Sequence, residues 1–148
     1  MTTATGFADG GGLFDDLIAA LQADALTVLD EAPRLGVFDT TRRQWVTGSG
    51  VFDFDDVTVE GFDRSAPYIA IVAGSVFTVE GGAASLSIEL ASRLQDHVMD
   101  VVNHGWPEAY EYDRFNGLLE PGTDAFGRVG WLLGGKLVAQ FGDLAKRA

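Results

Sequence analysis

The stretch PYIAIVAGSVFTVEGGAASLSIELASRLQDHVMDVVNHGWP, residues 67–107, decides the fold because strand patterns and a long helix pattern follow one another directly in it. Residues 67–81 begin with a continuous apolar run and continue with alternating apolar and polar residues, and Gly74 separates the two parts. A continuous apolar run is typical of a fully buried strand, whereas alternation is typical of a half-buried one. We therefore predict two strands here, the first of them well buried.

The second part of this stretch, residues 81–105, predicts a long helix. Its inner stripe at helical spacing consists of Leu90, Leu94, Val98 and Val101, flanked by Ala91 and Val102. Ser85 or Ser87 is expected to cap the start, because a serine hydroxyl accepts hydrogen bonds from the free amide groups there. Gly105 and Pro107 are expected to end the helix, since Gly adopts the left-handed C′ conformation and Pro cannot continue a helix.

An earlier helix is predicted from Phe14 to Leu29, where apolar residues recur at helical spacing. Pro33 is expected to stop it. Residues 1–12 are rich in Thr, Ala and Gly and are predicted to form a flexible N-terminal arm. Residues 13–148 are then most simply a single domain.

Further strands are predicted on both sides of the long helix. Residues 43–54 favour two strands around the loop at 48–50. Residues 126–144 favour a hairpin that turns at Gly134-Gly135, because Gly-Gly suits a two-residue turn. Residues 106–123 are expected to be irregular. The predicted fold class is therefore α+β: an antiparallel sheet of about four to six strands, two long helices and a C-terminal hairpin.

Composition limits the function. The chain has 148 residues, no cysteine and a net charge of −12, from 22 acidic and 10 basic residues. Thiol catalysis, thiolate metal sites and disulfides are excluded. So acidic a chain repels phosphate groups, so neither nucleic acid nor an anionic membrane is an expected partner, whereas a basic protein is permitted. No apolar run approaches the roughly 20 residues of a membrane span, and a cytoplasmic location is expected.

The two histidines, His97 and His104, raise the question of a metal site because acidic residues surround them. Seven residues of helix span roughly 10 Å, whereas metal–ligand bonds measure about 2 Å, so the two rings do not easily share one ion. Asp100 and His104, at i and i+4, are the remaining candidate pair. The alternative is that His104 interacts with the last carbonyl groups of the helix and pairs with Asp100. We predict no metal and no cofactor.

Two other patterns resemble binding motifs and fail in detail. Residues 130–137 match the first part of a phosphate-binding loop, but Leu137 replaces the required Ser or Thr and no helix is expected to follow. An oxygen-rich cluster lacks the spacing of a calcium-binding EF-hand loop and is interpreted as the wet face of a strand. This cluster consists of Asp53, Asp55, Asp56, Glu60 and Asp63.

Aromatic residues crowd the segment after the helix. They are Trp106, Tyr110, Tyr112 and Phe115. Aromatic side chains are enriched at protein interfaces, so these four are the predicted interaction residues. The alternative is that they close a small core and expose only their polar tips.

The last third of the chain resembles a set of small uncharacterised actinobacterial proteins, in which a helix leads to a Trp-Pro pair and a short hairpin. The matching positions are Gln95, Asp96, Trp106-Pro107, Leu119-Glu120-Pro121, Trp131, Val138-Ala139 and Gly142-Asp143-Leu144. The resemblance implies a small metal ribbon after the Trp-Pro pair. This chain lacks the cysteines and has residues 108–113 there, so aromatic packing is expected to replace the metal. The resemblance implies a topology and no activity.

These observations lead to an expected function and two alternatives. We expect a non-enzymatic, acidic binding or accessory protein that acts through protein–protein contacts, as immunity and adaptor proteins do. The first alternative is a small metal-dependent or acid–base enzyme that uses the edge formed by His97, Asp100 and His104. The second is a structural subunit of a larger assembly. Association of the chain with copies of itself into a homo-oligomer is compatible with this alternative. A pair of carboxylates can act as acid and base in catalysis, but no rule of sequence spacing selects such a pair in this chain.

Overall fold

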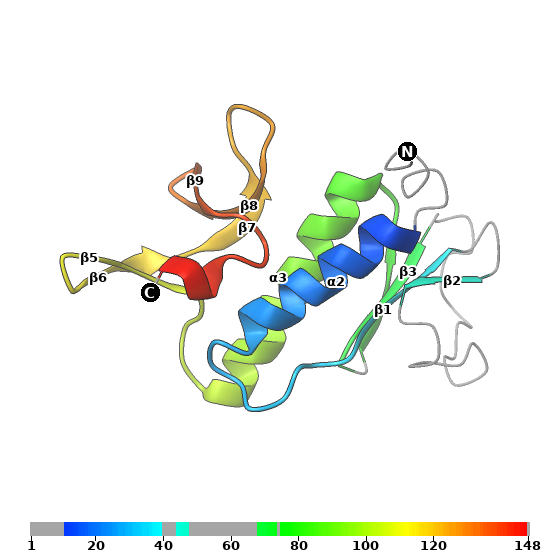
Figure 1. The fold of residues 1–148 in the computed structure, drawn as a ribbon, viewed down its shortest axis with the longest axis horizontal. Coiled ribbons are helices and arrows are strands. Elements are labelled where there is room, and N and C mark those ends of the chain that lie inside the picture. Colours follow the sequence, from blue (N-terminus) through cyan, green and yellow to red (C-terminus); the bar gives the residue numbers. More distant parts are fainter. Residues whose placement is uncertain (1–10, 40–43, 48–67, 74, 148) are drawn as a thin grey trace.

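The computed structural model of the chain describes residues 11–39, 44–47, 68–73 and 75–147 (Figure 1). The fold is α+β, and the described strands form sheets of four, two and three strands. The predicted loop at 48–50, the strand after it and the acidic cluster at 53–63 lie outside the described residues.

The four-stranded sheet is antiparallel and has the order β2-β1-β3-β4. Its strands are β1 (Leu35–Asp39), β2 (Gln44–Thr47), β3 (Tyr68–Val72) and β4 (Ser75–Val79). The two strands predicted within residues 67–81 are confirmed: β3 is buried along four of its five residues, and β4 pairs with it, with Val72 opposite Ser75. Strand β1 was not predicted, although its burial along Leu35–Phe38 matches a short apolar run in the sequence.

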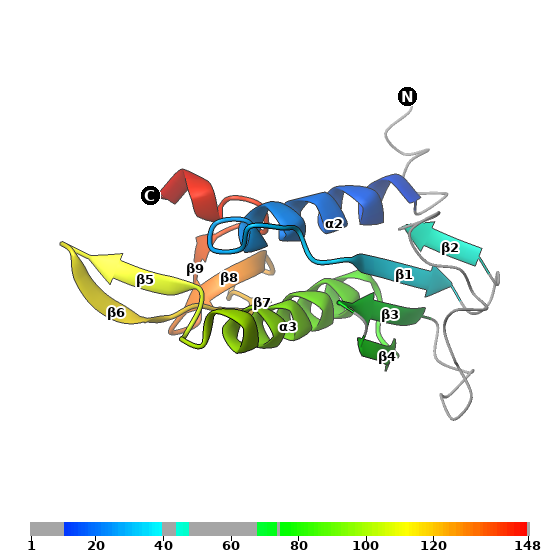
Figure 2. The ribbon, with the colours of Figure 1, turned by 90° about the horizontal axis from the view of Figure 1, so that it is seen from below.

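Two helices cover one face of this sheet and separate it from the C-terminal strands (Figures 1 and 2). They are α2 (Gly11–Ala25) and α3 (Ala83–Val102). Residues 11 and 12, predicted to belong to the arm, are helical. The first helix ends at Ala25, well before Pro33, and continues only as a turn to Val28.

The predicted ends of the long helix were wrong. At its start Gly82 takes the N-cap position and makes no side-chain capping bond, so neither Ser85 nor Ser87 is the cap. At its end Asn103, with φ of 62°, takes the left-handed conformation that was predicted for Gly105. Asparagine tolerates positive φ better than most residues with a side chain. Val101 lies on α3 but is 58% exposed, so the prediction that it belongs to the inner stripe was wrong.

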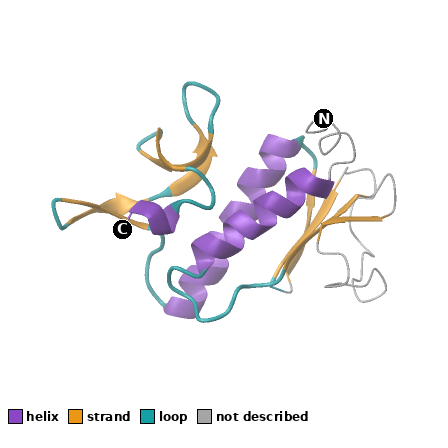
Figure 3. Ribbon diagram, viewed as in Figure 1, coloured by secondary structure: helices purple, strands orange, loops and turns teal. Residues whose placement is uncertain are grey.

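The segment predicted to be irregular contains strands (Figure 3). Strands β5 (Glu108–Glu111) and β6 (Arg114–Leu118) form a hairpin, and β7 (Glu120–Thr123), β8 (Val129–Leu133) and β9 (Lys136–Ala139) form an antiparallel sheet. The predicted turn at Gly134-Gly135 is confirmed between β8 and β9, where both glycines have positive φ. A 3₁₀ helix, η2 (Leu144–Arg147), follows.

One hydrophobic core runs through the described part of the molecule. The inner face of α3 contributes fully buried side chains, of which Leu90, Leu94 and Val98 were predicted. Burial of each such side chain contributes roughly 1.5–3 kcal/mol. The same cluster includes Trp131 of β8, which is fully buried and lies on the far side of the helices from the first sheet. The helices are therefore the layer that joins the two halves of the core.

Candidate functional site

The β5–β6 hairpin extends away from the rest of the molecule (Figures 1 and 2). Within the described part of the chain, no third strand pairs with it. Tyr110 and Phe115 are cross-strand partners, and their rings meet edge to face with centroids 6.1 Å apart. Such a pair stabilises a hairpin by roughly 0.2–1 kcal/mol. Most of both rings nevertheless faces solvent.

The tip of the hairpin carries the most exposed aromatic side chain of this segment. Tyr112 is 92% exposed, and Tyr112 and Asp113 have φ of 53° and 64°. Two consecutive positive φ values are typical of primed hairpin turns, which favour Asn-Gly or Gly-Gly because a side chain raises the energy of this conformation. The turn therefore holds a tyrosine where folding alone favours glycine.

The base of the hairpin is tied to α3 by one amide side chain. Gln95 is buried, and its Nε2 donates hydrogen bonds to the carbonyl oxygens of Trp106 at 3.0 Å and Leu119 at 2.7 Å. The amide of Leu119 also donates to the carbonyl of Pro107 at 2.8 Å. Both ends of the hairpin are thus fixed to the helix, whereas its tip is free.

Trp106 differs from the other predicted interaction residues because it is buried. It is 3% exposed, and its ring meets that of Trp131 edge to face at 5.4 Å. Its indole Nε1–H donates to the hydroxyl of Thr27 at 3.3 Å. Trp106 therefore holds the base of the hairpin against the turn that follows α2, and the exposed aromatic set consists of Tyr110, Tyr112 and Phe115.

A buried carboxylate fixes the C-terminal segment on the other side of this base. Asp24 of α2 accepts hydrogen bonds from Trp131 Nε1 at 2.8 Å, Gly142 N at 2.7 Å and Leu144 N at 3.1 Å. Burial raises the pKa of Asp24, and the three donors offset only part of the rise. The pattern of the sequence did not single out Asp24, because its partners lie more than 100 residues away along the chain.

A pocket of about 360 Å³ opens where the hairpin meets the end of α2. One part of its wall is apolar and includes Trp106, Pro107, Val28 and Leu144. The other part is polar and is formed by Thr27, His104, Glu108 and Tyr110. This volume lies at the lower end of the range of small-ligand sites.

Glu108 is the centre of the polar part of the pocket. Its Oε1 lies 3.4 Å from Nδ1 of His104, and its Oε2 accepts a hydrogen bond from the hydroxyl of Tyr110. Glu108 and Tyr110 are two apart on β5, so both side chains lie on the same face of the strand. The hydrogen bond to Glu108 raises the pKa of Tyr110.

Asp100 and His104, the candidate pair for a metal, do not lie on the same helix. Asp100 lies on α3, but His104 follows the end of that helix and pairs with Glu108, so the i, i+4 helical geometry expected for the two does not exist. His97 lies within α3. Among the described residues, no group of three or more His, Asp or Glu side chains is arranged to hold a metal ion.

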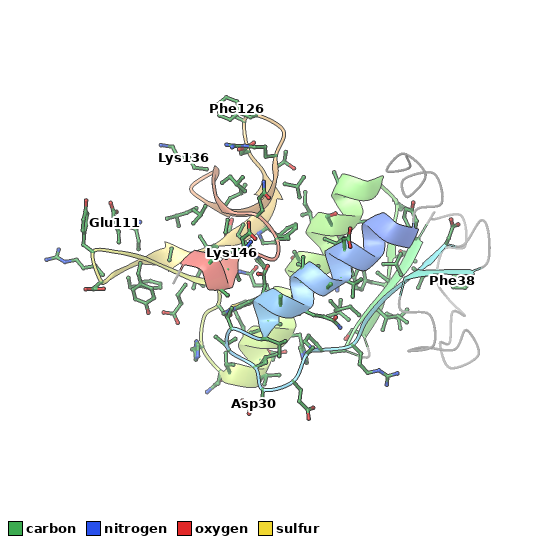
Figure 4. The ribbon with its side chains drawn as sticks, in the orientation of Figure 1. Asp30, Phe38, Glu111, Phe126, Lys136 and Lys146 are labelled. Carbon is green, nitrogen blue, oxygen red and sulfur yellow. The ribbon has the colours of Figure 1, made fainter. Side chains whose placement is uncertain are left out.

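Another exposed aromatic residue lies far from the hairpin. Phe126, at the tip of the β7–β8 loop, is 83% exposed (Figure 4). Asp124 supports this loop by accepting hydrogen bonds from the amides of Phe126 and Arg128 and from the Arg128 guanidinium. Burial acts to raise the pKa of Asp124, but the hydrogen bonds from Arg128 and Phe126 outweigh it and lower the pKa. Phe126 thus provides a matched exposed aromatic outside the candidate site.

No family model, curated protein or solved structure matches this chain. Of the helices in the described ranges, none has the length and apolar character that crossing a membrane requires. The geometry of the hairpin and its base is therefore the structural feature that bears on function.

Proposed function

We propose that this chain is a non-enzymatic accessory protein, of the immunity or adaptor kind, that binds a basic protein partner through the β5–β6 hairpin. The observation that carries the proposal is the exposed set of Tyr110, Tyr112 and Phe115 on a hairpin that projects from the body of the fold. Large exposed aromatic groups on a projecting element are typical of interaction sites.

The isolation of the hairpin supports the proposal. A two-stranded hairpin is at best marginally stable alone, and both of its edges present unpaired backbone groups. Here the chain fixes the base of the hairpin through Gln95, and in the described part of the fold no further strand pairs with either edge. A partner that covers the aromatic face adds the burial that the chain itself does not supply.

The charge of the hairpin indicates the kind of partner. Residues 108–118 carry three acidic side chains and one arginine, and the whole chain has a net charge of −12. Glu111 lies at the far end of the hairpin, away from the helices (Figure 4). A basic surface is attracted to this end at long range, which increases the association rate, and the aromatic groups then provide the buried contact.

The conformation of the turn supports a role outside folding. Tyr112 has a positive φ, costs roughly 1–2 kcal/mol relative to glycine there, and is almost fully exposed. Its side chain therefore brings little stability to the free protein. Contact with a partner explains why a tyrosine occupies a turn position at which folding alone favours glycine.

The test compares three forms of the full chain: wild type, the double variant Tyr112→Ser/Phe115→Ser, and the control Phe126→Ser. Each is immobilised and exposed to lysate of the source cell, bound proteins are quantified by mass spectrometry, and the leading basic protein is purified for calorimetry. We expect the double variant to bind it at least about tenfold more weakly and the control to bind it as wild type does.

Equal binding by wild type and the double variant contradicts the proposal, as does the absence of any captured basic protein. Sedimentation of the wild type tests the competing role as a subunit of a larger assembly. If the chain self-associates and the double variant is monomeric, the hairpin binds a second copy and the basic-partner proposal is wrong.

A further inference from the structure

We propose that the pocket at the base of the hairpin receives an arginine side chain of the partner, with Glu108 as the residue that binds its guanidinium. This inference rests on the proposed function and names the chemistry of its anchor. It concerns the space between the end of α2 and β5, which is lined by Val28, Trp106, Pro107, Glu108 and Tyr110 among others.

The charge of the lining favours a cation. Among the described residues that line the pocket, Glu108 is the one carboxylate, and neither lysine nor arginine is present. His104 approaches Glu108 at 3.4 Å and is charged only when protonated. An anion therefore meets a carboxylate without a permanent counter-ion in the pocket, whereas a cation is paired with it.

The hydrogen-bonding capacity of Glu108 favours a forked donor. An ionised carboxylate has roughly four acceptor positions, two on each oxygen. In this structure Oε2 accepts from Tyr110, and Oε1 faces His104. Each oxygen retains a position, so the carboxylate can accept two parallel N–H groups from one guanidinium. A lysine ammonium is a point charge and does not use both positions with the same geometry.

The apolar part of the wall suits the rest of an arginine side chain. Trp106, Pro107 and Leu144 are buried and present a wall against which a methylene stem can lie. The ring of Tyr110 lies at the rim, 57% exposed, and can contact a planar cation. The pocket and the aromatic set share Tyr110, so an arginine in the pocket places the partner beside Phe115 and the hairpin tip.

The inference is tested by NMR titration of the full chain with N-acetyl-arginine methylamide, with the neutral isostere N-acetyl-citrulline methylamide as ligand control. We expect the indole N–H of Trp106 and the amide of Glu108 to shift with the arginine compound and not with the citrulline compound. A single side chain binds weakly, so saturation is expected on the order of 1 mM or above.

The variant Glu108→Gln and the matched control Glu111→Gln lose the same charge from the same strand. Glu111 is exposed and does not line the pocket. We expect at least about tenfold weaker binding in Glu108→Gln and little change in Glu111→Gln. Backbone amide spectra of both variants show whether each is folded. Equal shifts with citrulline, equal loss in both variants, or no shift at all would overturn the inference.

The two proposals fail separately. If the partner binds Glu108→Gln as tightly as wild type but loses affinity for Tyr112→Ser/Phe115→Ser, the hairpin is the interface and the pocket is not its anchor. If the arginine compound binds the pocket but the hairpin variant retains the partner, the pocket binds guanidinium and the hairpin function is wrong. If the free arginine compound binds the pocket but Glu108→Gln leaves the affinity for the partner unchanged, the pocket binds a free small cation rather than a side chain of the partner.

Discussion

The carboxylate of Asp24 accepts a hydrogen bond from the indole Nε1–H of Trp131 at 2.8 Å, across 107 residues of chain. Asp24 and Trp131 are both fully buried, and the ring of Trp131 contacts Trp106 and Phe141 edge to face. This pair joins the first helix to the C-terminal sheet. Its partners also hold the wall of the pocket, so the candidate site depends on it.

Replacing Asp24 with Asn is expected to destabilise the protein by about 2 kcal/mol or more, because an amide leaves a buried donor facing another donor. Trp131 and Gly142 share Oδ2, and Leu144 donates to Oδ1. One of these oxygens becomes an NH₂ group. Urea unfolding measures the change. Asp30→Asn, at an exposed residue labelled in Figure 4, is the control and is expected to change stability little.

The titration of Asp24 is expected to have a midpoint above the ordinary value of 3.8, because burial raises its pKa and the charge of Asp143 adds to the rise. The folded protein then binds this proton more tightly than the unfolded chain does. The resulting stabilisation is full below the unfolded pKa and is lost as pH rises through the folded pKa. Carbon NMR of the Asp24 carboxyl measures the midpoint. Asp143→Asn is expected to lower it, and a midpoint at or below 3.8 contradicts the assignment.

Substituting Gly142 with Ala is expected to destabilise the protein by more than the roughly 1–2 kcal/mol that a positive φ costs. Gly142 has φ of 98°, and a Cβ there lies 2.9 Å from the Cβ of Ala20. Gly127→Ala is the matched control, because Gly127 has φ of 81° and an added Cβ meets no atom within 4 Å. Thermal unfolding of both variants separates the backbone cost from the contact. Equal losses mean that the contact with Ala20 has no effect.

Replacing Glu108 with Gln is expected to lower the pKa of Tyr110, because the hydrogen bond to Glu108 raises it in the wild type. Because this pKa is raised, the folded state retains the phenolic proton to higher pH than the unfolded chain does. The stabilisation that results is full below the unfolded pKa of the tyrosine and is lost as pH rises through the folded pKa. Ultraviolet absorbance during alkaline titration follows tyrosinate formation. Tyr110→Phe identifies which of the three tyrosines gives the late transition.

The variant Tyr112→Gly is expected to fold as well as wild type or to be stabilised by up to about 1 kcal/mol. Glycine removes the roughly 1–2 kcal/mol steric cost of positive φ, and its larger loss of backbone entropy on folding offsets part of this gain. The same change is expected to weaken partner binding, since it removes the most exposed ring of the hairpin. Chemical unfolding and calorimetry measure the two effects. A loss of stability shows that Tyr112 supports folding rather than binding.

The sequence by itself determined the parts of this protein that depend on local periodicity. The apolar run and alternation of residues 67–81 predicted β3 and β4, the helical stripe predicted α3, and Gly134-Gly135 predicted the turn between β8 and β9. Each of these patterns involves residues that are close together in the sequence, so it can be recognised without knowledge of the tertiary structure.

Other features were decided only by tertiary structure. The C-terminal end of α3 lies at Asn103 rather than at Gly105, and β5–β6 forms in a segment whose pattern is irregular. Asp24 and Gln95 gain their roles from partners that the fold brings near. A buried carboxylate or amide has no periodic signature, because its energy depends on which donors and acceptors surround it in space. The burial of Trp106 and the exposure of Tyr112, six residues apart, were decided in the same way.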